Sequence, residues 1–309
     1  MKLFWMRRIV IIFTVLFAQM LVSRCVWKPE VSSQPKLIVC TTTIIGDAVH
    51  QLAGNKYEVK TLMGPGVDPH IYEAKPSDVR ALGEARLIIY NGLHLEGKMT
   101  DLFKRIRHEK DIVSFSSGMS QSRLLTVGAG THDPHVWFDP KLWLQGIKKC
   151  KDELQNVFPY DRSFFEKKYQ KLKKEMVALD FELRKALESI PEKERIMITS
   201  HDAFHYFGRA YGVKVLAIQG ISTVSEPGLK DVSKLVNYIV KNKVKALFVE
   251  SSVSSKSIKA VIEGCLSRKH MVKIGGTLYS DALGDKKSKA DTYVRMMKKN
   301  VETIVTALK

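Results

Sequence analysis

The tripeptide Asp-Pro-His occurs twice in this sequence, and each copy is followed two residues later by an aromatic side chain. The copies end at His70 and His135. Proline locks its own φ near −65° and disfavours the helical region for the residue before it. Each histidine is therefore presented from a stiff, extended turn. Neutral imidazole in a fixed orientation is a good ligand for divalent transition metals.

Two further residues occupy comparable places at the ends of predicted strands. His201 follows the strand-like run RIMITS, and Asp281 follows the run VKIGGTLYS. In open α/β sheets, ligands bind outside the carboxyl ends of strands. We therefore predict one metal site between two halves of the chain, with two ligands from each half: His70, His135, His201 and Asp281.

The remaining histidines lack such a context. We expect them to be surface or supporting residues: His50, His94, His108, His132 and His270. A metal-bound imidazole usually donates its other N–H to a carboxylate or carbonyl, which fixes the tautomer. Four carboxylates near the predicted ligands are candidates for this role: Asp68, Asp133, Asp202 and Glu250.

The stretch SHDAFHYF supports a different interpretation. If a helix begins at His201, then His205 lies one turn further on the same face, as in the HExxH motif of zinc proteases. That motif has Glu at its second position as the general base, whereas this chain has the shorter Asp202. A zinc metallohydrolase using His201 and His205 is the alternative function. In the favoured interpretation, His205 is a plain surface residue; the other interpretation is an auxiliary nitrogen near the metal site.

Strand-like and helix-like runs alternate along the chain at βαβ spacing, which indicates an α/β fold with parallel sheets flanked by helices. In the first half, strands are predicted at 36–44, 57–66, 86–92 and 111–116, with helices at 45–55, 75–85 and 95–106. In the second half, strands are predicted at 195–200, 213–220, 244–251 and 272–280, with helices at 202–212, 228–243, 254–266 and 292–308. Ser77 is expected to cap the helix that begins near Pro76.

One long helix is predicted between the halves. Residues 162–189 contain no Gly or Pro, and Pro191 follows them. Apolar side chains recur at helical spacing: Phe165, Tyr169, Leu172, Met176, Leu179, Leu183 and Leu187. A single helix here is about 42 Å long, enough to traverse two lobes. The alternative is a coiled-coil segment, but one rigid helix joining two α/β lobes is more economical.

The N-terminus has the pattern of an export signal. The basic start MKLFWMRR precedes an apolar run at 9–22 that is short for a membrane span. Cys25 stands where a lipoprotein carries its acylated cysteine, but Arg24 occupies a position that normally holds a small residue. The predicted organisation is a signal peptide at 1–25, a linker at 26–35, an N-terminal lobe at 36–161, a connecting helix at 162–190 and a C-terminal lobe at 191–309.

The formal net charge is +18, which raises the question of nucleic-acid binding. The lysines lie mostly on predicted helices, and no aromatic-interleaved patch accompanies them, so a solvated basic surface is the simpler explanation. The four cysteines are scattered, without a CxxC pair, which excludes a zinc knuckle or a CxxC redox motif.

With these residues assigned, the sequence resembles the metal-specific solute-binding proteins of bacterial ABC importers, in particular the TroA-like branch (cluster A-I, solute-binding protein family 9). The matching stretches are GPGVDPHIYEAKPSDV, IIYNGLHLEGKM, DPHVWFDPKLW, TSHDAFHYFGRAYG, QGISTVSEPGLKD, FVESSVSSKSI, GGTLYSDALG and ADTYVRMMKKNVETIV. They follow one another over nearly the whole chain after residue 36. The resemblance implies a metal ion buried between two lobes on His70, His135, His201 and Asp281.

The resemblance also implies a function without bond chemistry. The protein would capture a divalent metal ion in the periplasm or at the outer face of the cell membrane. It would then deliver the ion, as a monomer, to an ABC permease and its ATPase. Manganese-specific members usually have Glu where this chain has His201, whereas zinc-dedicated members often carry a long His-rich loop that the segment 116–133 lacks. The cargo is therefore Zn²⁺, Mn²⁺ or Fe²⁺, with Zn²⁺ bound most tightly in vitro.

Overall fold

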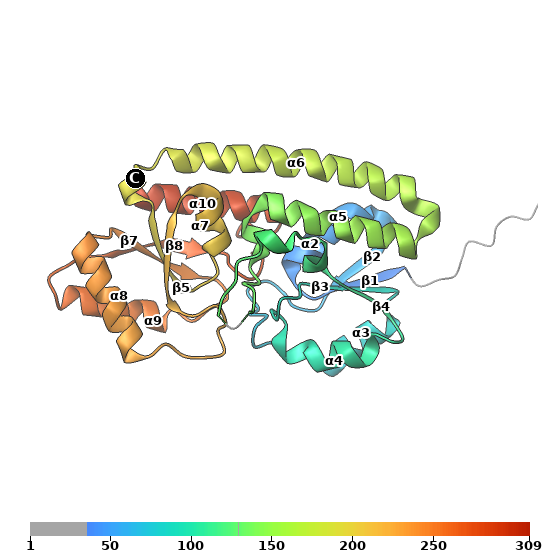
Figure 1. The fold of residues 1–309 in the computed structure, drawn as a ribbon, viewed down its shortest axis with the longest axis horizontal. Coiled ribbons are helices and arrows are strands. Elements are labelled where there is room, and N and C mark those ends of the chain that lie inside the picture. Colours follow the sequence, from blue (N-terminus) through green and yellow to red (C-terminus); the bar gives the residue numbers. More distant parts are fainter. Residues whose placement is uncertain (1–35, 129) are drawn as a thin grey trace, which may run out of the picture. The chain divides into compact units, whose positions relative to one another are not determined.

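The computed structural model describes residues 36–128 and 130–309, and the predicted signal peptide and linker lie outside them. The first lobe is built on a four-stranded parallel sheet in the order β2-β1-β3-β4. Its strands are β1 (Leu37–Cys40), β2 (Glu58–Thr61), β3 (Leu87–Tyr90) and β4 (Asp111–Ser114). The predicted parallel pairing is confirmed (Figure 1).

The two central strands of this sheet, β1 and β3, are buried on both faces, which explains why they are apolar runs, whereas the edge strands β2 and β4 contain exposed polar residues. Ile38 and Ile89 pack into the main core on the side of α2 (Thr43–Ala53) and α5 (Pro140–Val157). Val39 and Ile88 point to the opposite face, where α3 (Pro76–Glu84) and α4 (Thr100–Ile106) close a smaller core. Successive strand residues thus serve different cores.

Three details of the first lobe differ from the sequence expectations. Helix α3 begins at Pro76 with Lys75 as its N-cap, and the Asp78 carboxylate accepts a hydrogen bond from the Lys75 amide at 2.8 Å. Ser77 is therefore inside the helix and does not cap it. Helix α4 begins at Thr100, after a short 3-10 turn. Helix α5, capped by Asp139, was not delineated from the sequence.

The second lobe contains two parallel strand pairs that lie in contact with each other, not one continuous hydrogen-bonded sheet. One pair is β5 (Ile196–His201) with β6 (Lys214–Gln219), and the other is β7 (Ala246–Glu250) with β8 (Lys273–Leu278). Helices α7 (His205–Tyr211), α8 (Leu229–Asn242) and α9 (Lys256–Leu266) accompany them. A separate core containing Ile198, Leu247 and Ile258 lies within this lobe.

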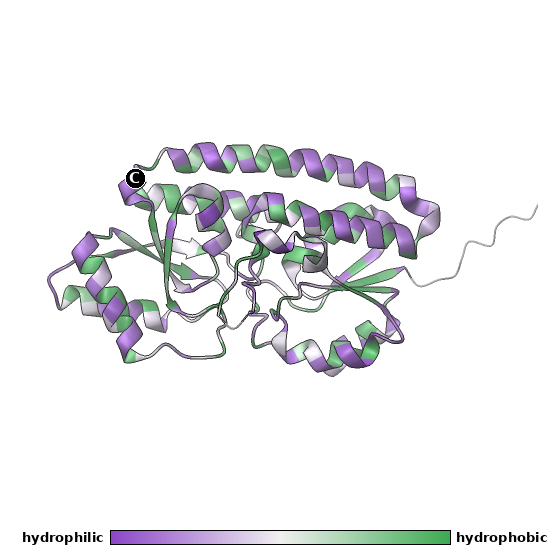
Figure 2. Ribbon diagram, viewed as in Figure 1, coloured by the Kyte–Doolittle hydropathy of each residue, from purple (hydrophilic) through white to green (hydrophobic). Residues whose placement is uncertain are grey.

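The connecting helix α6 (Arg162–Glu188) extends beside elements of both lobes (Figure 1). It packs against α2 and α5 of the first lobe and against the closing helix α10 (Tyr293–Leu308). All seven apolar residues predicted for its buried face are buried: Phe165, Tyr169, Leu172, Met176, Leu179, Leu183 and Leu187. Hydrophobic and hydrophilic residues alternate along this helix (Figure 2). It therefore contributes one side to the main core, as an amphipathic helix does.

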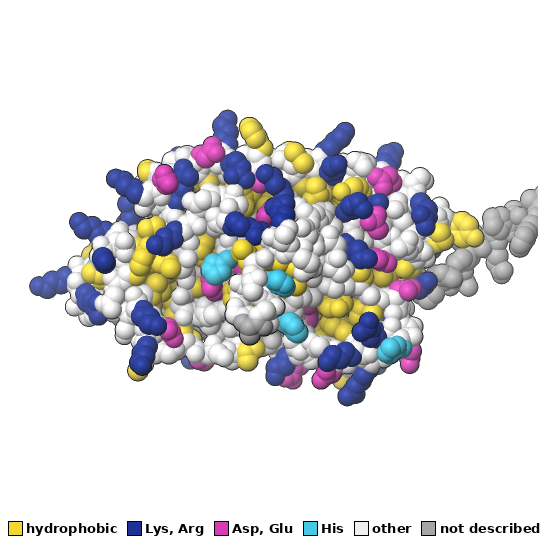
Figure 3. All heavy atoms as spheres, in the orientation of Figure 1, with side chains coloured by type: hydrophobic (Ala, Val, Ile, Leu, Met, Phe, Trp, Pro, Cys, Tyr) yellow, Lys and Arg dark blue, Asp and Glu magenta, His cyan; other side chains and the backbone are white. Residues whose placement is uncertain are grey.

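The basic side chains are dispersed over the visible surface, and the described cysteines are buried. On the face shown in Figure 3, Lys and Arg side chains are spread over many elements and do not gather in one stripe. In the described part of the chain, Cys40, Cys150 and Cys265 are buried and unpaired; Cys25 lies outside it. Within residues 36–128 and 130–309, no helix is long and apolar enough to cross a membrane.

Candidate metal centre

The two Asp-Pro-His turns place their histidines by the same local hydrogen bond. His70 lies in the turn after β2, and its backbone amide donates to Asp68 Oδ1 at 2.9 Å. His135 precedes a 3-10 turn at Val136–Phe138, and its amide donates to Asp133 Oδ1 at 2.9 Å. Each aspartate thus closes an Asx turn around the proline. The stiff presentation expected from the sequence is present in both turns.

The second lobe contributes one residue from a strand end and one from a loop. His201 is the last residue of β5, and its backbone amide donates to Glu250 Oε1 at 2.9 Å. Glu250 is itself the last residue of the neighbouring strand β7. Asp281 follows β8, and its Oδ2 accepts a hydrogen bond from the Ser252 hydroxyl at 3.0 Å. The carboxyl ends of these strands therefore supply the second half of the site.

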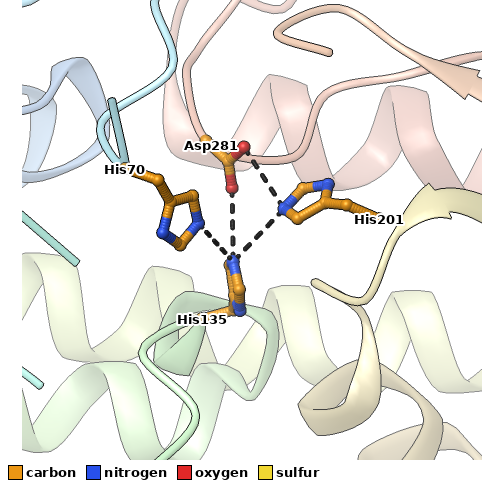
Figure 4. A group of neighbouring side chains, drawn as sticks. All are labelled: His70, His135, His201 and Asp281. Carbon is orange, nitrogen blue, oxygen red and sulfur yellow. Dashed lines mark hydrogen bonds and ion pairs between the residues drawn. The ribbon is translucent and has the colours of Figure 1, made fainter. Parts of the chain in front are cut away.

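The four predicted residues converge on one point, as Figure 4 shows. His135 Nε2 lies 3.2 Å from His70 Nε2, 3.4 Å from His201 Nε2 and 3.5 Å from Asp281 Oδ1. Asp281 Oδ2 lies 3.4 Å from His201 Nε2. All four potential donor atoms lie within 4.8 Å of one another, and all four residues are buried.

These separations suit a divalent ion of the size of Zn²⁺. Ligand atoms placed tetrahedrally at 2.0–2.1 Å from an ion are about 3.3–3.4 Å apart. Four of the donor separations, two of which use different oxygens of Asp281, are 3.2 to 3.5 Å and lie close to that value. Three imidazole nitrogens and a carboxylate are a donor set that Zn²⁺ accepts. Mn²⁺ prefers more oxygen, which a bidentate Asp281 could provide.

Two of the three imidazoles are held at their outer nitrogen by a carboxylate. His135 Nδ1 lies 2.7 Å from Asp133 Oδ1, and His201 Nδ1 lies 2.5 Å from Glu250 Oε2. Both pairs are fully buried. A proton on Nδ1 facing the carboxylate leaves the Nε2 lone pair directed into the site. In the described residues no carboxylate pairs with the ring of His70.

Burial and charge act in opposite ways on the ionisable groups of the site. Burial lowers the pKa of His70 to about 3, and the nearby His135 and His201 act in the same direction, so this imidazole is neutral. Burial also disfavours the charged form of His201, but the Asp281 and Glu250 carboxylates outweigh it and raise its pKa. For Asp281, the surrounding histidines outweigh burial and lower the pKa of the carboxyl.

The supporting roles expected for the carboxylates are only partly found. Asp133 and Glu250 contact metal-site imidazoles, as anticipated, whereas Asp202 contacts His205 Nε2 at 2.9 Å. His205 also places its Nδ1 3.8 Å from Asp133 Oδ2. It is therefore a partly exposed residue that lies beside two carboxylates, where the sequence led us to expect a plain surface residue.

The zinc-protease alternative requires one helix that contains both His201 and His205, and the structure has no such helix between these two residues. His201 ends a strand and α7 begins at His205, so the two residues do not lie on one helical face. The residues between them include Ala203 and Phe204, which are both fully buried and belong to neither element. Helical periodicity alone could not detect this break.

Residues that sequence reasoning missed connect the two lobes beside the site. The Thr223 hydroxyl of the second lobe donates to Asp68 Oδ2 at 2.6 Å. Trp137 of the first lobe donates its indole N–H to the Ser280 carbonyl at 2.8 Å, next to Asp281. Neither contact has a local sequence signal, because each joins residues that are more than a hundred positions apart.

The fold and the donor set together define a metal-binding protein with two α/β lobes joined by a long helix. Residues 38–307 match the family described as "ZnuA: Zinc-uptake complex component A periplasmic". The chain belongs to this family of substrate-binding components of ABC transporters, which are not enzymes. The resemblance inferred from the sequence motifs is confirmed.

Individual relatives differ in the metal that they are named for. The chain is 43% identical to the manganese-binding lipoprotein MntA of Bacillus subtilis over 279 residues, which cover 90% of this chain and 91% of the relative. It is 42% identical to the zinc-binding protein TroA of Treponema pallidum over 272 residues, 88% of each chain. The solved structure of that periplasmic zinc-binding protein superposes with a TM-score of 0.87, covering 89% of this chain and 99% of the other.

Proposed function

We propose that this protein captures a divalent transition-metal ion outside the cytoplasm on His70, His135, His201 and Asp281, and delivers it to an ABC permease. The observation that carries the proposal is the convergence of these four buried residues from two lobes, with donor atoms within 4.8 Å of one another. Three nitrogens and one oxygen form a donor set that suits reversible capture of a divalent ion.

The metal proposed for tight binding in vitro is Zn²⁺, with Mn²⁺ as the competing cargo. The donor set of three imidazoles favours Zn²⁺, and the Irving–Williams order places Zn²⁺ well above Mn²⁺ for such a site. The two relatives named above are described as binding manganese and zinc respectively, so relatedness supports both ions. Selection between them in the cell depends on metal supply as well as on affinity.

The proposed organisation keeps the divisions expected from the sequence. Residues 1–25 form an export signal, residues 26–35 a linker, and residues 36–161 and 191–309 the two lobes on either side of the connecting helix at 162–190. We propose that the mature protein acts as a monomer beside the permease and its ATPase. Because α6 packs against elements of both lobes, release of the ion is expected to involve small lobe movements and not wide closure.

The test is a zinc titration of the mature protein, in competition with a chelator, for the wild type, His201→Ala and Asp281→Ala. Each substitution removes one of four donors and leaves buried polar groups without a partner, so we expect affinity to fall by more than about 100-fold. His108→Ala, at an exposed histidine, is the matched control and should bind as the wild type does. Wild-type affinity in both site variants would refute the assignment.

A further inference from the structure

His205 occupies an unusual position between the surface and the buried site. It is the first residue of α7, and 37% of its side chain is exposed. Its outer nitrogen, Nε2, lies 2.9 Å from Asp202 Oδ1, and its Nδ1 lies 3.8 Å from Asp133 Oδ2. One face of the imidazole thus meets a carboxylate that belongs to the support of the metal site, while the ring remains accessible to solvent protons.

Asp133 is the group that connects His205 to the site. Its carboxylate is fully buried. Oδ1 accepts from the His135 backbone amide and lies 2.7 Å from His135 Nδ1, whereas Oδ2 has no hydrogen-bond partner in the described part of the chain. Among the ion pairs of the described residues, the partner of Oδ2 is His205, whose Nδ1 lies 3.8 Å away. A continuous path runs from a half-exposed imidazole, through one buried carboxylate, to a predicted metal ligand.

We infer that His205 adjusts metal affinity through Asp133, so that the site binds more weakly when this imidazole carries a proton. The inference rests on the proposed function. A negative Asp133 raises the basicity of His135 and attracts the cation. A positive charge on His205 offsets that negative charge and also repels the ion, because both effects act through a buried region of low polarity. His205 is thus a positioning residue that acts through Asp133 and does not itself ligate the ion.

The surroundings of His205 favour its charged form near neutral pH. The Asp202 carboxylate beside Nε2 raises the pKa of His205, burial opposes this, and the charge of Asp133 adds to the increase. Of the elements packed against α7, the turn Val136–Phe138 has no titratable side chain, and Lys214 of β6 lies over the Tyr238 ring. On α7 itself, Arg209 is paired with Asp139, which also binds Arg123.

The direction of the pH effect follows from this charge state. Because its pKa lies above the ordinary histidine value, His205 keeps its proton to a higher pH than an unperturbed imidazole does and loses it as the pH rises further. Wild-type affinity should therefore gain a contribution from His205 between neutral and alkaline pH. Linkage also requires the reverse effect. Binding of the metal must increase the acid dissociation constant of His205 by the factor that separates the metal affinities of its neutral and protonated forms.

The experiment compares zinc affinity of the mature wild type, His205→Gln and His205→Lys by chelator competition from about pH 6.5 to pH 9. The uncharged His205→Gln should bind about three- to tenfold more tightly than the wild type at the acidic end, and the difference should vanish at the alkaline end. His205→Lys, which stays charged, should match the wild type at the acidic end and bind more weakly at the alkaline end. His108→Gln is the control for loss of an exposed histidine.

A second readout separates this effect from a structural one. The pKa of His205, followed by NMR of its ring protons, should fall on zinc binding by the logarithm of the affinity ratio. Parallel pH profiles for the wild type and both His205 variants, or an unchanged His205 pKa, would overturn the inference while leaving the proposed metal site intact. Absence of zinc binding by the wild type would instead refute the proposed function, and the inference with it.

Discussion

The aspartates of the two Asp-Pro-His turns make one contact in common and differ in their second contact. In both, the aspartate closes its own turn by accepting the histidine amide at 2.9 Å. Asp133 then holds the Nδ1 of its own histidine, whereas Asp68 directs its second oxygen to Thr223 in the other lobe. One aspartate therefore tunes a predicted ligand, and the other connects the two lobes.

The second lobe shows that local sequence is not needed for the first of these roles. Glu250 accepts the His201 amide and faces His201 Nδ1, as Asp133 does for His135, although it lies 49 residues away in sequence. The same arrangement is thus obtained once within a turn and once between neighbouring strand ends. The comparison shows that a carboxylate supports a metal-site imidazole by its position in space, whatever its separation from the histidine in sequence.

The largest expected effect that tests this comparison is that of Asp133→Asn. Asparagine keeps a hydrogen-bond acceptor for the turn but removes the buried charge that supports His135. We expect zinc affinity to fall by about 10- to 100-fold, the usual loss for such a supporting group. Chelator competition at pH 7.5 measures it.

Glu250→Gln is the matched variant in the other lobe, and it should lose affinity to a similar extent. A loss confined to Asp133→Asn would show that the two arrangements are not equivalent.

A smaller effect concerns the charge states of His70 and His201. Burial keeps His70 neutral, with a pKa of about 3, whereas Asp281 and Glu250 outweigh burial and raise the pKa of His201. At pH 7, zinc must therefore displace a proton from His201 and none from His70. We expect zinc binding to release protons at pH 7, and affinity to fall as the pH decreases below the raised pKa of His201.

Calorimetry in buffers of different ionisation enthalpy measures the number of protons released. No proton release at pH 7 would contradict the charge assigned to His201.

The smallest expected effect on affinity is that of Asp68→Asn. Its hydrogen bonds to the His70 amide and to Thr223 are retained in part by the amide oxygen, and no carboxylate pairs with the His70 ring in the described residues. We expect less than about a threefold change in zinc affinity, with faster release because a contact between the lobes is weakened.

Stopped-flow chelation measures the release rate, with Thr223→Val as the companion variant that removes only the donor. An affinity loss as large as that of Asp133→Asn would remove the distinction between the two turns.

The sequence predicted those parts of the molecule that depend on local spacing. The period of apolar residues identified the buried face of α6, and alternation of strands and helices indicated the α/β fold. The positions of His70, His135, His201 and Asp281 near strand ends were enough to predict that they meet. That the four residues bind the ion remains a prediction to be tested by the titration above.

Other features could not be predicted because they depend on neighbours that are distant in sequence. The zinc-protease alternative required one helix through His201 and His205, but β5 continues through His201, which pairs with Gln219 of β6. The second lobe separates into two strand pairs, and β8 carries a register irregularity opposite Leu247 and Phe248 that no propensity indicates. Such breaks are decided by pairing and burial.

The two Asp-Pro-His turns show which features the local sequence determines and which depend on the tertiary structure. Proline and the short aspartate side chain determine the local conformation, because φ restriction and an Asx hydrogen bond act within three residues. Only the tertiary structure decided that Asp133 would support His135 and face His205 while Asp68 would reach Thr223. Asp68 Oδ2 accepts a hydrogen bond from Thr223, whereas Asp133 Oδ2 has no hydrogen-bond partner in the described residues and lies 3.8 Å from His205 Nδ1, because tertiary folding brings different groups to the two turns.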